Sequence, residues 1–166
     1  VLKNAGIATV MVTHDPQEAM YMADRIIIMN EGQIMQDGSP ETLYFRPENR
    51  FVASFFGEVN RFPGTVVDGK VATPFGDVDS QSIENGTEVE VLIRPEGLHI
   101  GEALNGHDVL AHVDAVRVLG EVNLVHLTLE AGAHIHARVP RRFSPINQPS
   151  VAITLDPDMA FVFPMT

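Results

Sequence analysis

The pattern of apolar and polar positions opens with a strand followed by a helix. Thr9 to Val12 is a short apolar run rich in β-branched side chains, typical of a strand buried on both faces of a parallel sheet. Asp15 suits a helix N-cap, with Pro16 at the first helical position and Glu18 placed to reach back toward the cap. We therefore predict a helix over Pro16 to Ala23.

The next segment predicts a hairpin and two short helices. Arg25 to Met29 and Gln33 to Gln36 are strand-like and flank a turn signal. Ser39 is placed to cap a short helix, and apolar residues at helical spacing recur after Pro47 up to Gly57. At this spacing we interpret the aromatic residues as core packing rather than a docking stripe; they are Phe51, Phe55 and Phe56.

From Gly57 to Asn60 onward the helical period gives way to short β-rich runs separated by turn residues. This texture predicts a small barrel or sandwich. The candidate strands are Gly64 to Asp68, Lys70 to Thr73, Glu88 to Arg94, Val109 to Leu119, Glu121 to Glu130, His134 to Val139, Val151 to Asp156, and Met159 to Phe163.

Two details refine this prediction. The apolar residues of the fourth candidate strand change parity, so we expect a bulge or bend near Ala115, as a small closed barrel of the OB type requires. Val89 to Glu96 and Val151 to Asp158 also share one pattern of alternating apolar residues ending in proline and a carboxylate. The echo suggests two strands in equivalent positions.

Composition excludes several classes of protein. The chain is 45% hydrophobic and 20% charged, which is ordinary for a soluble fold. Eleven Lys and Arg against 22 Asp and Glu give a net charge of −11, which argues against nucleic acid as a partner. The chain has no cysteine, in agreement with a cytosolic protein, and no apolar run approaches the ~20 residues of a membrane span.

His14 is the first candidate for chemistry, because it follows the predicted Thr9 to Val12 strand at the sheet edge where α/β proteins bind ligands. Spacing alone favours a structural histidine. The longer string THDxxEAM (Thr13 to Met20), with its continuation to Gly57, closely resembles the end of the nucleotide-binding subunit of bacterial ABC importers. The resemblance implies that His14 is the switch-loop residue that contacts the ATP γ-phosphate.

The same resemblance implies that ATP and Mg²⁺ are bound mainly by residues upstream. The chain has no G-x-x-x-x-G-K-[ST] phosphate loop, and Val1 to Ala5 resembles the tail of a helix. We expect a truncated chain, without cofactor and inactive as an ATPase by itself. Residues 1–57 would be an α/β remnant of the nucleotide-binding domain, and residues 58–166 an all-β OB-like barrel.

The second half resembles the transport-associated OB (TOBE) domain of the sugar, polyamine, sulfate and ferric-iron importers. Ile93-Arg94-Pro95-Glu96-x-Leu98 and Phe161 to Pro164 carry the resemblance. It implies a homodimer that contacts permease subunits and, indirectly, a periplasmic solute-binding protein, on the cytoplasmic side of the inner membrane. The transported substrate stays open, with a slight preference for iron or polyamine.

Other chemistries fit less well. His134-x-His136 places two imidazoles on one strand face, near His112 and His126, but without cysteine or a carboxylate pattern we predict no metal site. Arg141-Arg142-Phe143 is a lone basic loop rather than a nucleic-acid groove. The alternative function is a stand-alone regulatory or small-ligand-binding OB module without ATPase activity.

Overall fold

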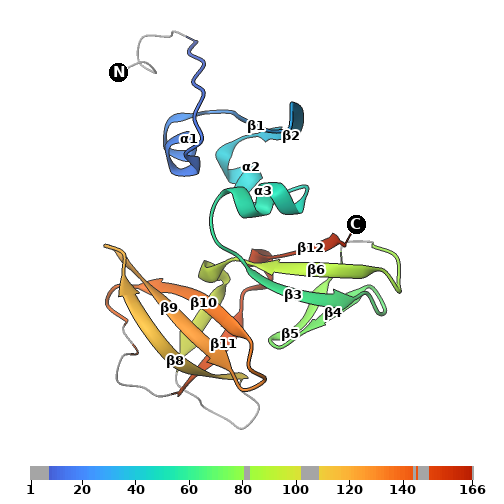
Figure 1. Cartoon of the computed structure of the whole chain (residues 1–166), viewed down its shortest axis with the longest axis vertical. Coiled ribbons are helices and arrows are strands. Elements are labelled where there is room, and N and C mark those ends of the chain that lie inside the picture. Colours follow the sequence, from blue (N-terminus) through green and yellow to red (C-terminus); the bar gives the residue numbers. More distant parts are fainter. Residues whose placement is uncertain (1–7, 81–82, 102–108, 144, 146–149, 166) are drawn as a thin grey trace.

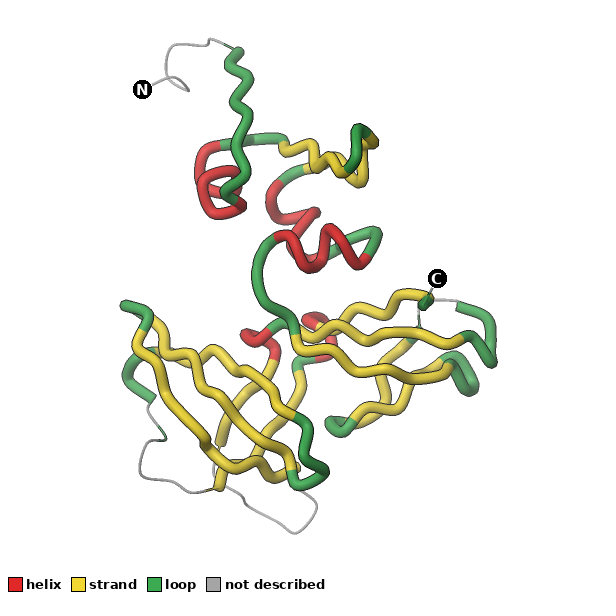
Figure 2. The backbone as a smooth tube through the Cα atoms, in the orientation of Figure 1, coloured by secondary structure: helices red, strands yellow, loops and turns green. Residues whose placement is uncertain are grey.

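The computed structural model describes residues 8–80, 83–101, 109–143, 145 and 150–165. Figure 1 shows a small helical part at the N-terminal end, joined by one connecting segment to a larger part built of strands. The tube in Figure 2 shows that helix dominates the first part and strand the second. No helix in the described ranges is long and apolar enough to cross a membrane. The expected helix tail at Val1 to Ala5 lies outside the described residues.

The N-terminal part is held by well-capped short helices around a small apolar cluster. Asp15, Ser39 and Asn49 each accept a hydrogen bond from a backbone N–H of the helix they precede. The cluster contains Ala19, Ile26, Ile28, Leu43 and Val52. The elements are α1 (Pro16–Met22), β1 (Ile26–Asn30), β2 (Gln33–Gly38), α2 (Pro40–Phe45) and α3 (Arg50–Phe55).

The predicted hairpin is confirmed, because β1 and β2 pair antiparallel. The predicted strand at Thr9 to Val12 is wrong for this chain: the segment has no regular structure, and Val10 and Val12 are 93% and 95% exposed. A strand of this apolar type depends on neighbours that cover both faces, and no described segment pairs with it. Within the described residues 8–57, the structure therefore does not show an α/β sheet.

The β-rich part confirms the predicted texture. Its strands are β3 (Asn60–Thr65), β4 (Lys70–Thr73), β5 (Gly76–Asp79), β6 (Glu88–Ile93), β7 (Leu98–Gly101), β8 (Val109–Val118), β9 (Val122–Leu129), β10 (His134–Pro140), β11 (Ser150–Leu155) and β12 (Ala160–Pro164). The strand predicted at Gly64 to Asp68 begins earlier, at Asn60, and β5 and β7 were not predicted.

Two main sheets enclose the larger core. A five-stranded sheet has the order β10-β9-β8-β11-β7, and a three-stranded sheet has the order β12-β6-β3, both with antiparallel neighbours. The edge strands β10 and β7 of the larger sheet approach each other, so that this sheet is nearly closed. The predicted bulge is confirmed, because the β8–β9 register shifts between Val113 and Ala115.

The sequence echo corresponds to two equivalent strand-turn-strand units. Each unit contributes one strand to each of the two main sheets, where it pairs with a strand of the other unit. The 3₁₀ turn η2 (Pro95–Gly97) joins β6 to β7, and η3 (Pro157–Met159) joins β11 to β12. Strand β6 pairs with β12, whereas β11 pairs with β7. The turns pack so closely that a Cβ atom on Gly97 would lie 2.3 Å from the Cβ atom of Met159. Any side chain at Gly97 would therefore push the units apart.

Candidate functional site

His14 lies exposed in the segment that enters α1, and its neighbours fix the backbone on both sides of it. The Thr13 hydroxyl oxygen accepts a hydrogen bond from the Asp15 N–H (3.1 Å) and donates to Glu18 Oε2 (2.6 Å). The Asp15 carboxylate in turn accepts from the N–H groups of Gln17 and Glu18. Glu18 therefore bonds to Thr13 rather than to the backbone of the cap residue, which corrects our prediction.

This geometry leaves the His14 side chain accessible to a ligand. His14 is the one site residue that the sequence predicts, and the neighbouring Asp15 and Glu18 carboxylates would repel a phosphate. His14 therefore requires cationic groups from elsewhere if it is to face a nucleotide.

A second constellation lies where the helical part meets the strands, and Arg94 is its centre. Arg94 follows β6 and is only 1% exposed. Its Nε and Nη2 groups donate to the Tyr44 carbonyl oxygen (3.2 and 2.9 Å), and Nη1 donates to the Ala53 carbonyl oxygen (3.3 Å). The guanidinium carbon lies 3.8 Å from the centre of the Tyr44 ring, a cation–π contact. Arg94 thus joins α2 and α3 to the barrel.

The Tyr44 side chain extends this connection to the seam of the larger sheet, where its edge strands β10 and β7 approach each other. The Tyr44 phenol is half-buried, and burial together with the Glu96 charge raises the pKa of Tyr44. Glu96 accepts a hydrogen bond from Arg138 of β10. Burial lowers the pKa of the Arg94 guanidinium, although Tyr44 and Glu96 oppose that shift. We call Tyr44, Arg94, Glu96 and Arg138 the joint.

Apolar and polar contacts flank the joint. Ala53 of α3 packs with Leu92 and Phe161 in a small buried cluster. Beside it, Glu90 of β6 pairs with Arg61 at 3.0 Å, and Arg61 also donates to the Ser54 hydroxyl at 2.9 Å. The two parts of the chain are therefore held together by buried contacts as well as by the connecting segment.

Asn60, the first residue of β3, closes the seam beside the joint. Its amide nitrogen donates to the His136 carbonyl oxygen (2.8 Å), and its amide oxygen accepts from the His136 N–H (2.7 Å). The same nitrogen reaches the Ile93 carbonyl oxygen at 3.3 Å. One buried side chain therefore satisfies the edge of β10 as a neighbouring strand would.

Two histidines of β10 lie on one face of their strand, as the strand pattern predicts. His134 and His136 share one face of β10, while Ile135, Ala137 and Val139 are buried on the other. His126 lies opposite His136, and the Thr128 hydroxyl bonds to the His134 ring at 2.9 Å. Within the described ranges, no three His, Asp or Glu side chains converge as metal ligands.

Comparison with known proteins finds related sequences for both halves of the chain. The TOBE domain family matches residues 91–163. The spermidine/putrescine import ATP-binding protein PotA of Salmonella typhimurium is 37% identical over 141 residues, which is 78% of this chain and 36% of that protein. This chain matches the C-terminal, TOBE-bearing region of ABC importer ATP-binding subunits. It spans about a third of the length of these relatives.

Two other relatives show a similar level of identity. PotA of Vibrio cholerae is 40% identical over 67% of this chain and 32% of that protein. The putrescine transport protein PotG of Escherichia coli is 37% identical over 84% of this chain and 40% of that protein. Among solved structures, the cytoplasmic molybdate-binding protein ModG superposes with a TM-score of 0.51 at 15% identity, covering 64% of this chain and 96% of ModG. That likeness supports the OB-like fold.

Sequence reasoning identified the Ile93 to Leu98 motif but not the contacts of its residues. In the structure Ile93 and Leu98 fill the core, while Arg94 and Glu96 belong to the joint. The available signal was the lone arginine between an apolar strand and a proline, because a cation at such a position is buried only when it is well hydrogen-bonded. The TOBE motif thus contributes structural contacts here, and His14 is the candidate for chemistry.

Proposed function

We propose that this chain is the C-terminal region of the ATP-binding subunit of a polyamine ABC importer. Residues 1–57 would complete the ATPase domain and residues 58–166 would form the TOBE domain. The observation that carries the proposal is the 37–40% identity to importer subunits named for spermidine and putrescine. Within the whole subunit, Thr9 to Val12 would gain the neighbours that a buried strand needs, and His14 would face the nucleotide.

In this proposal the complete subunit binds ATP and Mg²⁺, mostly through residues outside this chain. His14 would stabilise charge on the γ-phosphate or orient the attacking water. The subunit would act at the cytoplasmic face of the inner membrane through permease subunits, receiving cargo indirectly from a periplasmic solute-binding protein. The buried joint would transmit movements of the ATPase domain to the TOBE domain.

The test uses the whole reading frame. We expect a phosphate loop and a signature motif to be encoded upstream, and the full-length subunit to restore ATP-dependent putrescine or spermidine uptake in cells that lack their own subunit. Restored uptake of iron or sugar instead would contradict the polyamine assignment. A reading frame without a phosphate loop would contradict the ATPase proposal and favour the stand-alone module.

We also propose that the chain self-associates as a homodimer, through the β-rich part and with exchange of the N-terminal segment. Exposed apolar side chains support this proposal, and Val10, Val12, Tyr21, Val118 and Leu119 are each more than half exposed. Identical chains usually cover such surface by two-fold pairing. Light scattering at micromolar concentration should give twice the chain mass of 18.2 kDa. A monomer mass that does not change on concentration would refute the dimer.

A further inference from the structure

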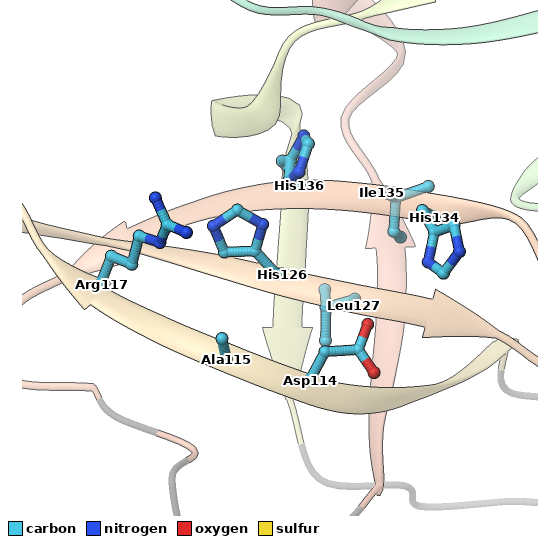
Figure 3. A pocket seen from close by; sticks show the side chains of 8 residues that line it. All are labelled: Asp114, Ala115, Arg117, His126, Leu127, His134, Ile135 and His136. Carbon is cyan, nitrogen blue, oxygen red and sulfur yellow. The ribbon is translucent and has the colours of Figure 1, made fainter.

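The outer face of the five-stranded sheet carries a hollow of about 320 Å³. Figure 3 shows the side chains that surround it: Arg117, His126 and His136 lie together, and Asp114 and His134 lie toward the other end. They come from the adjacent strands β8, β9 and β10. The hollow is separate from His14, and its ability to hold a ligand is independent of the proposed function.

The sequence builds this hollow through the β8 bulge and one small residue. The register sets Ala115, His126 and His136 in one row across the three strands. Ala115 has no side-chain atom beyond Cβ, so the surface is recessed at β8. The imidazoles on β9 and β10 stand beside this recess. The bulge also presents Asp114 on the exposed surface beside Ala115. Leu127 and Ile135 point to the core and keep the floor rigid.

One end of the hollow has nitrogen groups of His126 and Arg117 without partners among the described residues. The Nε2 atom of His126 is buried and has no hydrogen-bond partner, although buried polar atoms are normally satisfied. The His126 and His136 rings meet edge to face, with their centres 4.6 Å apart. The guanidinium of Arg117 makes no ion pair within the described part of the chain.

The acidic group at the other end is already engaged. Asp114 accepts a hydrogen bond from the Thr128 hydroxyl at 2.6 Å and lies 3.2 Å from the His112 ring nitrogen. These bonds lower the pKa of Asp114 and hold its carboxylate toward His134 and His112. The carboxylate that approaches His126 from outside the sheet is Glu58 of the connecting segment. Neither acid forms an ion pair with Arg117.

We propose that this hollow binds a small molecule bearing an oxyanion, a carboxylate or a phosphate group, through Arg117, His126 and His136. A guanidinium matches two oxygens of such a group, and a charged acceptor would satisfy the orphaned Nε2 atom of His126. The site lies next to the contacts that flank the joint, because His136 also lines a second hollow with Ser54, Glu58 and Arg61. A ligand at His136 would therefore touch the strand edge that Asn60 closes.

Binding should take up a proton. Burial, followed by the charges of His136 and Arg117, lowers the pKa of His126, while Glu58 and Asp114 weakly oppose this shift. The free protein therefore keeps His126 neutral at neutral pH, and a bound anion favours the charged ring. Affinity should rise as the pH falls, by up to about tenfold per pH unit above the pKa of the free His126 ring.

The experiment is an NMR titration of the histidine ring signals in the whole 166-residue chain. Sulfate serves as the phosphate-like probe, because it stays dianionic at neutral and mildly acidic pH, and succinate serves as the carboxylate probe. We expect saturable shifts of His126 and His136 with a Kd of about 1 mM, and no shift of the exposed His14. Whichever probe binds more tightly identifies the class of ligand.

Matched variants locate the site. Arg117 and Arg142 are both exposed, and replacing either should leave the fold intact. Arg117→Gln should weaken binding about tenfold, whereas Arg142→Gln should leave the Kd unchanged. The proposal is overturned if neither probe gives saturable shifts, if Arg117→Gln binds as the parent does, or if the affinity fails to rise with falling pH.

Discussion

Replacing Arg94 by alanine should lower the free energy of unfolding by at least about 3 kcal/mol, because hydrogen bonds from a buried charge are lost and a cavity remains. The guanidinium is 1% exposed and donates to the carbonyl oxygens of Tyr44 and Ala53. These carbonyls would keep no equivalent donor in the variant. Urea unfolding followed by circular dichroism would measure the loss.

Arg94→Lys should restore little of this stability. An ammonium carries its three donors on one nitrogen and lacks the planar fork whose separate nitrogens reach both carbonyls, and it stacks less well on the Tyr44 ring. Arg25 provides the matched control, because its ion pair with Asp37 is on the surface. Arg25→Ala should leave the urea midpoint unchanged. An Arg94→Ala midpoint equal to that of the parent would disprove the role of the joint.

Local signals in the sequence were sufficient for much of the fold. Caps such as Asp15 and Ser39 act within one helical turn, so their residue types predict the helix starts. The parity change in β8 predicted the bulge because only one face of that strand is covered by the core. Strands β5 and β7 were missed because four residues such as Gly-Asp-Val-Asp carry too little alternation.

The remaining features depend on contacts between distant segments. Thr9 to Val12 has the composition of a buried strand, but a strand forms only where a neighbour pairs with it. Arg94 meets Tyr44 across 50 positions of sequence, so no local pattern could reveal that contact. The sequence placed His134 and His136 on one face, but the pairing register was needed to set His126 and Arg117 beside them.

The largest functional effect should follow from His14→Ala in the full-length subunit, which we expect to lower ATP turnover about 100-fold or more. This prediction rests on the proposed function. If the imidazole supports charge that develops on the γ-phosphate during transfer, the interaction is formed mainly in the transition state. Loss of the ring should then depress kcat while ATP binding changes little.

Two measurements on purified full-length protein decide this prediction. Steady-state phosphate release gives kcat, and equilibrium binding of a fluorescent ATP analogue gives the affinity for nucleotide. The control is His99→Ala, since His99 is an exposed histidine on β7 within the TOBE-like barrel and its loss should leave turnover unchanged. The exposed position of His14, with its backbone fixed by Thr13 and Asp15, means that the substitution removes only the ring. Turnover at the parent level would therefore show that His14 does not act on the nucleotide.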